Sequence, residues 1–278
     1  MKILFIPSSI CGGMKDSASD RIRCDWVFPY LDAEKCNGSQ NLNNYEVLIF
    51  MKSFPLRVAM QYHHKLIIWD ISDVWRFNSK EEIDKCLKYV DLVLIPCESL
   101  KDDFVERFPN TLAYVVPDGH KLESYDARKV HKDRKPVFVW HGYSGNFQRD
   151  KVQEIIREIE ERYELIVISD ESVGKGIFIK WNEETFSEEM IKGDICINPQ
   201  YWFKSNNKTV TAWALGLPVV DKKEDIKRFL NYKERIKESE FRLKDINKYH
   251  VRYSAEMIKN LIFDYTKKKE YNRVKVGI

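Results

Sequence analysis

The sequence predicts an α/β protein made of two Rossmann-like domains that face each other across a cleft. Short apolar segments, each suited to one buried strand, alternate along the chain with amphipathic segments typical of helices. Buried strands that alternate with helices favour a mostly parallel sheet. The alternation stops once, at the charged segment 126–136, and then starts again. Two consecutive blocks of this kind indicate two domains.

The first block, 1–125, predicts the N-terminal domain. Its expected strands are 2–6, 46–50, 65–70, 92–96 and 113–116, and its expected helices are 19–28, 55–63, 80–89 and 99–107. The opening segment, MKILFIPSSI, is too short an apolar stretch for a signal peptide and predicts the first strand. The segment SKEEIDKCLKYV illustrates a helix signal, because Ser79 suits an N-cap and Glu81 and Glu82 suit the first turn.

The second block, 137–252, predicts the C-terminal domain, and 126–136 predicts the linker before it. The expected strands are 137–141, 164–169, 177–181, 194–199 and 218–220, and the expected helices are 149–161, 184–191, 206–215 and 224–231. A long helix near 253–268 lies in the last segment, 253–278, which we expect to cross back to the N-terminal domain. Ligands of such sheets bind at the carboxyl ends of the strands, so the cleft between the domains is the expected site.

Composition indicates a globular cytoplasmic protein. Hydrophobic residues make up 44% of the 278 residues and charged residues 32%, and no apolar run approaches the roughly 18 residues of a membrane span. The six cysteines form no CxxC pair, which argues against a zinc site or a disulfide framework. From Asp221 onward, 17 Lys and Arg stand against 10 Asp and Glu, a net charge of +7. Either a solvated helical face or an anionic partner, such as a membrane surface or a nucleic acid, accounts for this charge.

The segment SNNKTVTAWALGLPVV, 205–220, places two lysines near a predicted helix N-terminus. The helix is expected to start between Ser205 and Asn207 and to end at Gly216. Lys204 and Lys208 then stand at the end of the helix that disfavours cations. A bound diphosphate would remove the conflict, because helix N-termini bind phosphate. The alternative is that both side chains extend into solvent.

A second candidate phosphate site is VWHGYSGNFQRD, 139–150, where a strand ends at His141. Gly142 and Gly145 allow a tight turn, and Arg149 and Lys151 begin the next helix. The segment matches neither the Walker loop nor GxGxxG. An ordinary turn between a strand and a helix is the alternative interpretation.

The second half of the chain resembles the donor-binding domain of the group 1 glycosyltransferases, which have the GT-B fold. AWALGLPVV, preceded by the strand DICINP, resembles the family's Glu-Ala-Met-Ala-x-Gly-x-Pro-Val-Val element, and VFVWHGYSGN followed by Arg149 and Lys151 resembles its first donor-domain strand. Tyr253-Ser254-Ala255-Glu256 resembles the terminal Tyr-Ser-x-Glu segment. In the first half, DLVLIPCESLKDDFVERF, AYVVPDGHKLESY and ICGGMKDSASDRIR resemble less distinctive elements. The last of these contains Gly12 and Gly13, in a loop that in the family meets acceptor and diphosphate. The resemblance therefore implies that the N-terminal domain, 1–125, lies on the acceptor side of the cleft.

The resemblance implies transfer of a sugar, with retention of configuration, from a UDP- or GDP-linked donor to an acceptor. No DxD-type metal element occurs in the donor half, so a metal-independent site is expected, with Lys, Arg and helix N-termini meeting the charge of the leaving group. One departure from the family concerns two glutamates, eight positions apart, that often bind the donor sugar and ribose. Phe203 and Thr211 occupy those positions here.

The candidate residues follow from these motifs. The diphosphate set is Gly142, Ser144, Gly145, Asn146, Arg149, Lys151, Lys204, Lys208 and Thr209. Asn206, Asn207 and Thr211 are candidates for the donor sugar and ribose, and Trp181 for the base. Asp70, Asp73 and His141 are candidate catalytic residues, with a helix-capping or structural role as the alternative for each.

Three rival interpretations remain open. The chain could be a nucleotide-sugar epimerase or hydrolase, an inactive GT-B-like nucleotide-binding or partner subunit, or a glycosyltransferase that modifies DNA bases. The missing glutamates favour the second, and the basic C-terminal segment suits the third. The acceptor could be a glycan, a lipid-linked glycan, a small molecule or a modified nucleic acid, and a lipid-linked one would place the protein at the periphery of a membrane. The oligomeric state is left undefined by the sequence.

Overall fold

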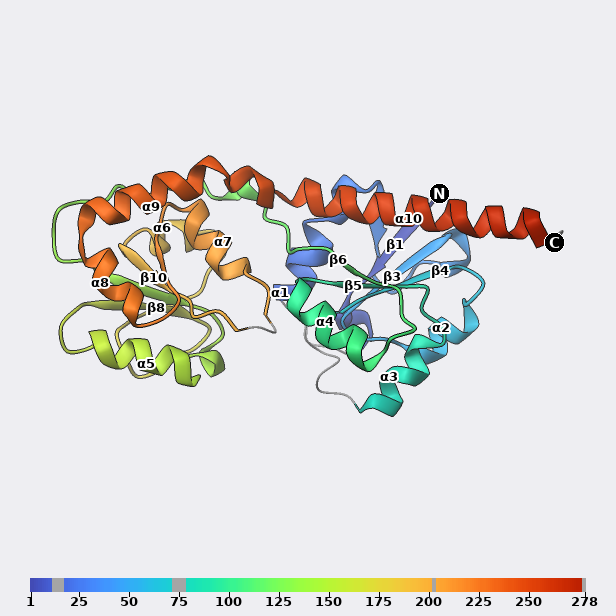
Figure 1. The fold of residues 1–278 in the computed structure, drawn as a ribbon, viewed down its shortest axis with the longest axis horizontal. Coiled ribbons are helices and arrows are strands. Elements are labelled where there is room, and N and C mark those ends of the chain that lie inside the picture. The colour runs from blue at the N-terminus through green and yellow to red at the C-terminus, as the bar shows by residue number, and fades with distance from the viewer. Residues whose placement is uncertain (12–17, 72–78, 202–203, 277–278) are drawn as a thin grey trace. The chain divides into compact units, whose positions relative to one another are not determined.

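The chain folds into two units, each built on a parallel sheet. The computed structural model describes residues 1–11, 18–71, 79–201 and 204–276, with side chains described through residue 268. Unit 1 comprises Met1–His120, Trp202–Ser205 and Tyr249–Ile278, and unit 2 comprises Lys121–Tyr201 and Asn206–Lys248. Figure 1 shows a sheet and its covering helices in each unit. This arrangement confirms the predicted class of two Rossmann-like domains.

In its described part, unit 1 has a six-stranded sheet in the order β2-β1-β3-β4-β5-β6, with every pairing parallel. The strands are β1 (Ile3–Ile6), β2 (Ala33–Lys35), β3 (Val47–Met51), β4 (Leu66–Asp70), β5 (Leu92–Ile95) and β6 (Ala113–Val115). The helices are α1 (Ala18–Asp20), α2 (Leu56–Gln61), α3 (Lys80–Leu87), α4 (Glu98–Arg107) and α10 (Val251–Val276). A π-helical turn, Arg21–Asp25, follows α1.

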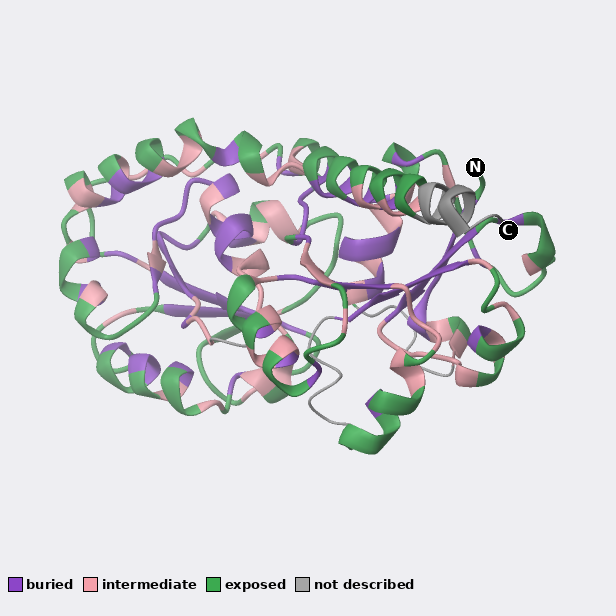
Figure 2. Cartoon of the chain, turned by 45° about the vertical axis from the view of Figure 1, so that its right-hand side comes forward, coloured by how far each residue is buried: buried purple, intermediate pink, exposed green. Residues whose placement is uncertain are grey.

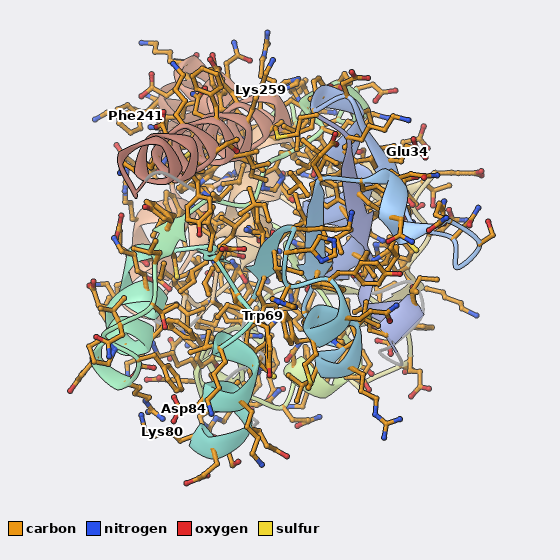
Figure 3. All side chains as sticks on the ribbon, turned by 90° about the vertical axis from the view of Figure 1, so that its right-hand side faces the viewer. Glu34, Trp69, Lys80, Asp84, Phe241 and Lys259 are labelled. Atoms are coloured by element: carbon orange, nitrogen blue, oxygen red, sulfur yellow. The ribbon has the colours of Figure 1, made fainter. Side chains whose placement is uncertain are left out.

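Successive residues of these strands point to opposite faces, so each sheet face has its own core. One face packs against α10 through Val251, Ala255, Ile258 and Ile262. The other packs against α2, α3 and α4, and Figure 1 shows these helices on the side of the sheet opposite α10. Figure 3 shows Trp69 inside the unit and Lys80 and Asp84 on the exposed side of α3.

Unit 2 has, among its described residues, a five-stranded parallel sheet in the order β11-β10-β7-β8-β9. The strands are β7 (Phe138–His141), β8 (Leu165–Ser169), β9 (Ile177–Lys180), β10 (Ile195–Ile197) and β11 (Val219–Val220). The helices are α5 (Asp150–Ile159), α6 (Phe186–Met190), α7 (Asn207–Ala214), α8 (Glu224–Leu230) and α9 (Tyr232–Lys244). α5 and α8 cover one face, where Ile155, Ile156 and Phe229 are buried. Figure 2 shows the buried strands and the exposed outer surfaces of the helices in both units.

Three elements differ from the expectation. The segment expected as one helix, 19–28, consists of α1, the π-helical turn and a 3-10 turn, Phe28–Tyr30, in which Pro29 removes a backbone donor. β2 and α9 were not predicted, because AEK and YKERIKESEFRLK lack a clear apolar pattern. The segment 126–136 belongs to unit 2, where Lys129 Nζ is 2.8 Å from Asp194 Oδ1, and its role as a linker stays a prediction.

Candidate functional site

Lys208 is fixed at the carboxyl end of β7. It lies in the first turn of α7, and its ammonium nitrogen donates a hydrogen bond to the carbonyl oxygen of His141 at 3.0 Å. The same nitrogen lies 5.2 Å from the ring centroid of Trp140. Glycine suits residue 142, because its φ of +148° would strain any other residue and because a Cβ, 2.1 Å from Lys208 Nζ, would displace that ammonium group. The structure thus joins the two candidate phosphate segments of the sequence at one point of unit 2.

The N-terminus of α7 is suited to an anion. Within the described residues, the N-cap Asn206 makes no capping hydrogen bond through its side chain, and the first turn of α7 contains no acidic residue. The backbone N–H groups of such a turn and the helix dipole both favour negative charge. Thr209 accepts a hydrogen bond from Asn198 Nδ2 at 2.8 Å, which ties this turn to the end of β10. Lys208 adds a full positive charge beside the N-terminus, so the local field favours an anion strongly.

The glycine turn after β7 uses several of its own donors internally. The backbone N–H of Ser144 donates to Asp170 Oδ1 at 2.6 Å, and the Ser144 hydroxyl donates to Asp170 Oδ2 at 3.2 Å. The N–H of Asn146 donates to the carbonyl of Tyr143 at 2.8 Å. At Gly145, a Cβ would lie 2.9 Å from the Tyr143 ring. This turn therefore offers an anion fewer donors than its glycines suggest, and α7 offers more.

Arg149 and Lys151 gather around one aromatic ring. Arg149 is the N-cap of α5, and its guanidinium carbon lies 5.0 Å from the ring centroid of Tyr201. Lys151 Nζ lies 5.2 Å from the same centroid and donates to the carbonyl of Gln200 at 3.0 Å. The ring face attracts both cations and holds them near the carboxyl ends of β7 and β10. Tyr201 is not among the predicted site residues, and its only signal in the sequence is its position after the strand DICINP.

Lys204 belongs to unit 1 and Lys208 to unit 2. Burial, together with the charge of Lys52, lowers the pKa of Lys204 to about 8. A nearby anion would relieve this repulsion between two ammonium groups. In unit 1, Lys204 therefore has an environment that favours negative charge.

His141 is buried at the end of β7. Its side chain is 8% exposed and packs edge-on against Phe186, with the ring centroids 5.2 Å apart. Burial and then the charge of Lys208 lower the pKa of His141 to about 3, so the imidazole is neutral at pH 7. Its Nε2 has no hydrogen-bond partner among the described residues.

Asp70 lies in unit 1 and is 1% exposed. Its Oδ1 accepts a hydrogen bond from Arg23 Nε at 2.7 Å, and Arg23 also donates to Asp118 Oδ1 at 2.7 Å. Burial raises the pKa of the Asp70 carboxyl, against the opposing charge of Arg23. In this arrangement Asp70 anchors the π-helical turn, and its role as a base stays a prediction. Asp73, Gly12 and Gly13 lie outside the described residues.

The candidates for sugar, ribose and base differ in accessibility. Thr211 is 7% exposed, and its hydroxyl donates to the carbonyl of Asn207 at 3.0 Å and lies 3.3 Å from the Tyr125 hydroxyl. Asn206 and Asn207 are half-buried at the start of α7. Trp181 follows β9, is 37% exposed, and donates its backbone N–H to Ser169 at 2.8 Å. Trp181 is therefore accessible to a ligand, whereas the hydroxyl of Thr211 is held inside the unit.

Two further properties concern the described part of the chain. There, no group of three or more His, Cys, Asp or Glu side chains converges as a metal site would require. Among the same residues, none of the helices combines the length and the apolar character needed to cross a membrane.

Comparison with solved structures identifies the architecture. The chain is similar to Anabaena HepE in complex with UDP and glucose, with a TM-score of 0.67 and 9% identity over 95% of this chain and 100% of that one. The chain therefore has the GT-B fold. A glycosyltransferase from Rickettsia africae has a TM-score of 0.66 and 10% identity, over 96% of this chain and 98% of that one. The lipopolysaccharide outer core galactosyltransferase WaaB, in its apo form, has a TM-score of 0.61 and 11% identity, over 95% of this chain and 99% of that one. Neither a protein-family model nor a curated protein sequence matches the chain.

Proposed function

We propose that this GT-B protein is a glycosyltransferase that moves a sugar from a UDP- or GDP-linked donor to an acceptor. The observation that carries the proposal is the position of Lys208 in the first turn of α7, a turn that contains no acidic residue, with its ammonium nitrogen held on the carbonyl oxygen of His141. The similarity to a structure that contains UDP and glucose supports the same ligand class here. Donor binding is assigned to unit 2.

The chemistry of the proposed site follows from its charges. Transfer of the sugar leaves a nucleoside diphosphate, whose developing negative charge must be stabilised. Lys208 and the first turn of α7 are placed to do this, and Arg149 and Lys151 supply two more cations at the same sheet edge. Side chains and a helix N-terminus are sufficient for this role, so we propose a metal-independent reaction. Retention of configuration is proposed from the resemblance of AWALGLPVV alone.

A second candidate function is a nucleotide-binding subunit without activity. It is favoured by Phe203 and Thr211, which replace the glutamates that often bind sugar and ribose in the resembling family. The Thr211 hydroxyl is also committed to the Asn207 carbonyl. Such a subunit would bind the donor and leave it intact.

Calorimetry with UDP and GDP tests nucleotide binding. We expect a Kd of about 1 μM to 1 mM for one of them, the range usual for substrates. Lys208→Met should weaken binding about tenfold or more, because it removes a charged hydrogen-bond donor. Lys237→Met, an exposed lysine of α9, is the matched control and should change little. The proposal would be falsified if neither UDP nor GDP binds, or if Lys208→Met and Lys237→Met change the affinity equally.

Turnover separates the two candidate functions. Labelled nucleotide sugars are incubated first without acceptor and then with glycan, lipid-linked, small-molecule and nucleic-acid acceptors. Transfer to one acceptor class supports the glycosyltransferase. Binding of UDP or GDP without consumption of any nucleotide sugar supports the inactive subunit.

A further inference from the structure

Asp170 is a fixed carboxylate at the carboxyl edge of the unit 2 sheet. It is the first residue after β8, it is exposed, and Ser144 holds both of its oxygens through the N–H at 2.6 Å and the hydroxyl at 3.2 Å. Desolvation opposes its ionisation, but the hydrogen bonds from Ser144 keep the pKa of Asp170 below its usual value. Among the described residues, Asp170 forms no ion pair with Lys or Arg. The structure therefore orients an ionised carboxylate without neutralising it.

The order of the strands places this carboxylate relative to the proposed diphosphate site. α7 follows β10, and the sheet continues from β10 to β7, β8 and β9. Figure 1 shows α7, β10 and β8 within unit 2. Neighbouring strands are about 4.8 Å apart, so Asp170 lies about 10 Å along the edge from the end of β10, and Trp181 lies one strand further. Gly142, at the end of β7 between them, contributes no side chain, and the space beside it holds the ammonium group of Lys208.

A nucleoside diphosphate has its groups in the same order. The diphosphate would lie at α7 and Lys208, the ribose would come next, and the base would lie farthest, near the exposed Trp181. A carboxylate has about four acceptor positions, and Ser144 uses two of those on Asp170. In dinucleotide-binding sheets of this class, an acidic residue about 20 residues beyond the glycine turn hydrogen-bonds the ribose 2′-hydroxyl. Asp170 follows β8, the next strand along the chain after the glycine turn.

Resting on the proposed function, we infer that Asp170 binds the ribose hydroxyls of the donor nucleotide. Group 1 glycosyltransferases often bind the ribose with a glutamate at the position that Thr211 occupies here, and we assign that role to Asp170 in this chain. Thr211 is unsuited to that part, because it is 7% exposed and its hydroxyl donates to the Asn207 carbonyl. The ribose subsite thus belongs to the β7–β8 side of the sheet and not to α7.

The experiment compares four ligands on wild type and three variants by calorimetry. The ligands are the preferred nucleoside diphosphate, its 2′-deoxy and 3′-deoxy forms, and pyrophosphate. The variants are Asp170→Asn, Ser144→Ala and Glu171→Gln, where Glu171 is the exposed neighbouring carboxylate and controls for the change in charge. Pyrophosphate lacks ribose, so its affinity reports the phosphate site alone.

Wild type and Glu171→Gln should bind the ribonucleotide about tenfold or more tightly than at least one deoxy form, as expected for a hydrogen bond to a charged group. Asp170→Asn should bind the ribonucleotide and both deoxy forms within about threefold of one another. Its affinity for pyrophosphate should be unchanged or higher, because a nearby negative charge has been removed. Ser144→Ala removes the hydroxyl that donates to Asp170 but keeps the carboxylate charge, so its preference for the ribonucleotide over the deoxy forms should be intermediate. If Asp170→Asn fails to fold, the result for Ser144→Ala tests the ribose contact instead.

Three outcomes overturn the inference, and they differ in whether the proposed function is overturned as well. If Asp170→Asn retains the discrimination of wild type, Asp170 does not bind ribose, while donor binding stands. If wild type binds the ribonucleotide and its deoxy forms equally, the inference also fails while donor binding stands. If wild type binds no nucleoside diphosphate, the proposed function falls together with the inference.

Discussion

The ammonium nitrogen of Lys208 lies 2.1 Å from the point that a Cβ would occupy at residue 142, so Lys208 depends on Gly142 for its position. The two residues are 66 positions apart in the chain and come from different elements, the end of β7 and the first turn of α7. This pair places a cation at the carboxyl edge of the unit 2 sheet. Several consequences for binding and stability can be measured.

Gly142→Ala should weaken nucleotide binding about as much as Lys208→Met. The new methyl group would displace Lys208, and the φ of +148° would add backbone strain that we expect to cost about 1–3 kcal/mol of folding free energy. Calorimetry and urea unfolding measure the two effects. Gly174→Ala is the control, because Gly174 has a φ of +74° and no atom within 4 Å of its Cβ position. It should lose stability but keep affinity. Native affinity in Gly142→Ala would contradict this coupling.

His141 should make the folding free energy depend on pH. Its pKa is about 3 in the folded protein and about 6.5 when unfolded, so between these values only the unfolded chain binds the proton. The stability contributed by neutral His141 is present above pH 6.5 and is lost as pH falls toward 3, by at most about 1.4 kcal/mol per pH unit. Urea unfolding of wild type and His141→Gln from pH 7.5 to 4.5 should show a shallower decline in the variant. Burial also lowers the pKa of His120, to about 4, but His120 is present in both proteins, so its contribution to the pH dependence is the same in each. Parallel pH profiles would refute this assignment.

Lys129→Met should destabilise the protein strongly. Asp194 is fully buried, and its partner Lys129 has a side chain that is only 6% exposed. Removing the lysine leaves a buried carboxylate with one remaining cation, which costs about 3–5 kcal/mol. Arg134→Met removes the other cation of Asp194, but Arg134 is 51% exposed, so we expect a loss of about 0–1 kcal/mol. Chemical denaturation of both variants measures the difference, and equal losses would show that burial of the pair does not decide its energy.

Asp70→Asn tests whether Asp70 acts in catalysis or in stability. The amide can still accept a hydrogen bond from Arg23, but the charge is lost, so we expect about 2 kcal/mol lower stability. If Asp70 only anchors Arg23, kcat per folded molecule should stay close to that of wild type. A fall in kcat of about 100-fold or more in a fully folded variant would instead support Asp70 as a general base.

The strands of both sheets could be predicted because each is a short run of buried apolar residues. LVLI and LIVIS form β5 and β8 at the expected positions. The edge strand β2 could not be predicted, because Ala33–Lys35 is recognisable only by its pairing with β1. Helix α9 has a charged surface on most sides, so its pattern is weak in the sequence.

The sequence by itself determined the fold class, the boundary signals of the helices, and the two segments that contain the candidate phosphate-binding residues. These are local properties, set by apolar periodicity and by the chemistry of caps and turns. Only the tertiary structure decided which residues meet. In the folded chain, Lys208 contacts His141 and lies beside Gly142, and Asp70 accepts a hydrogen bond from Arg23. Asp170 accepts the N–H of Ser144 in the glycine turn, and Thr211 is buried. Such contacts depend on strand order and on packing between residues far apart in the chain, which local patterns do not encode.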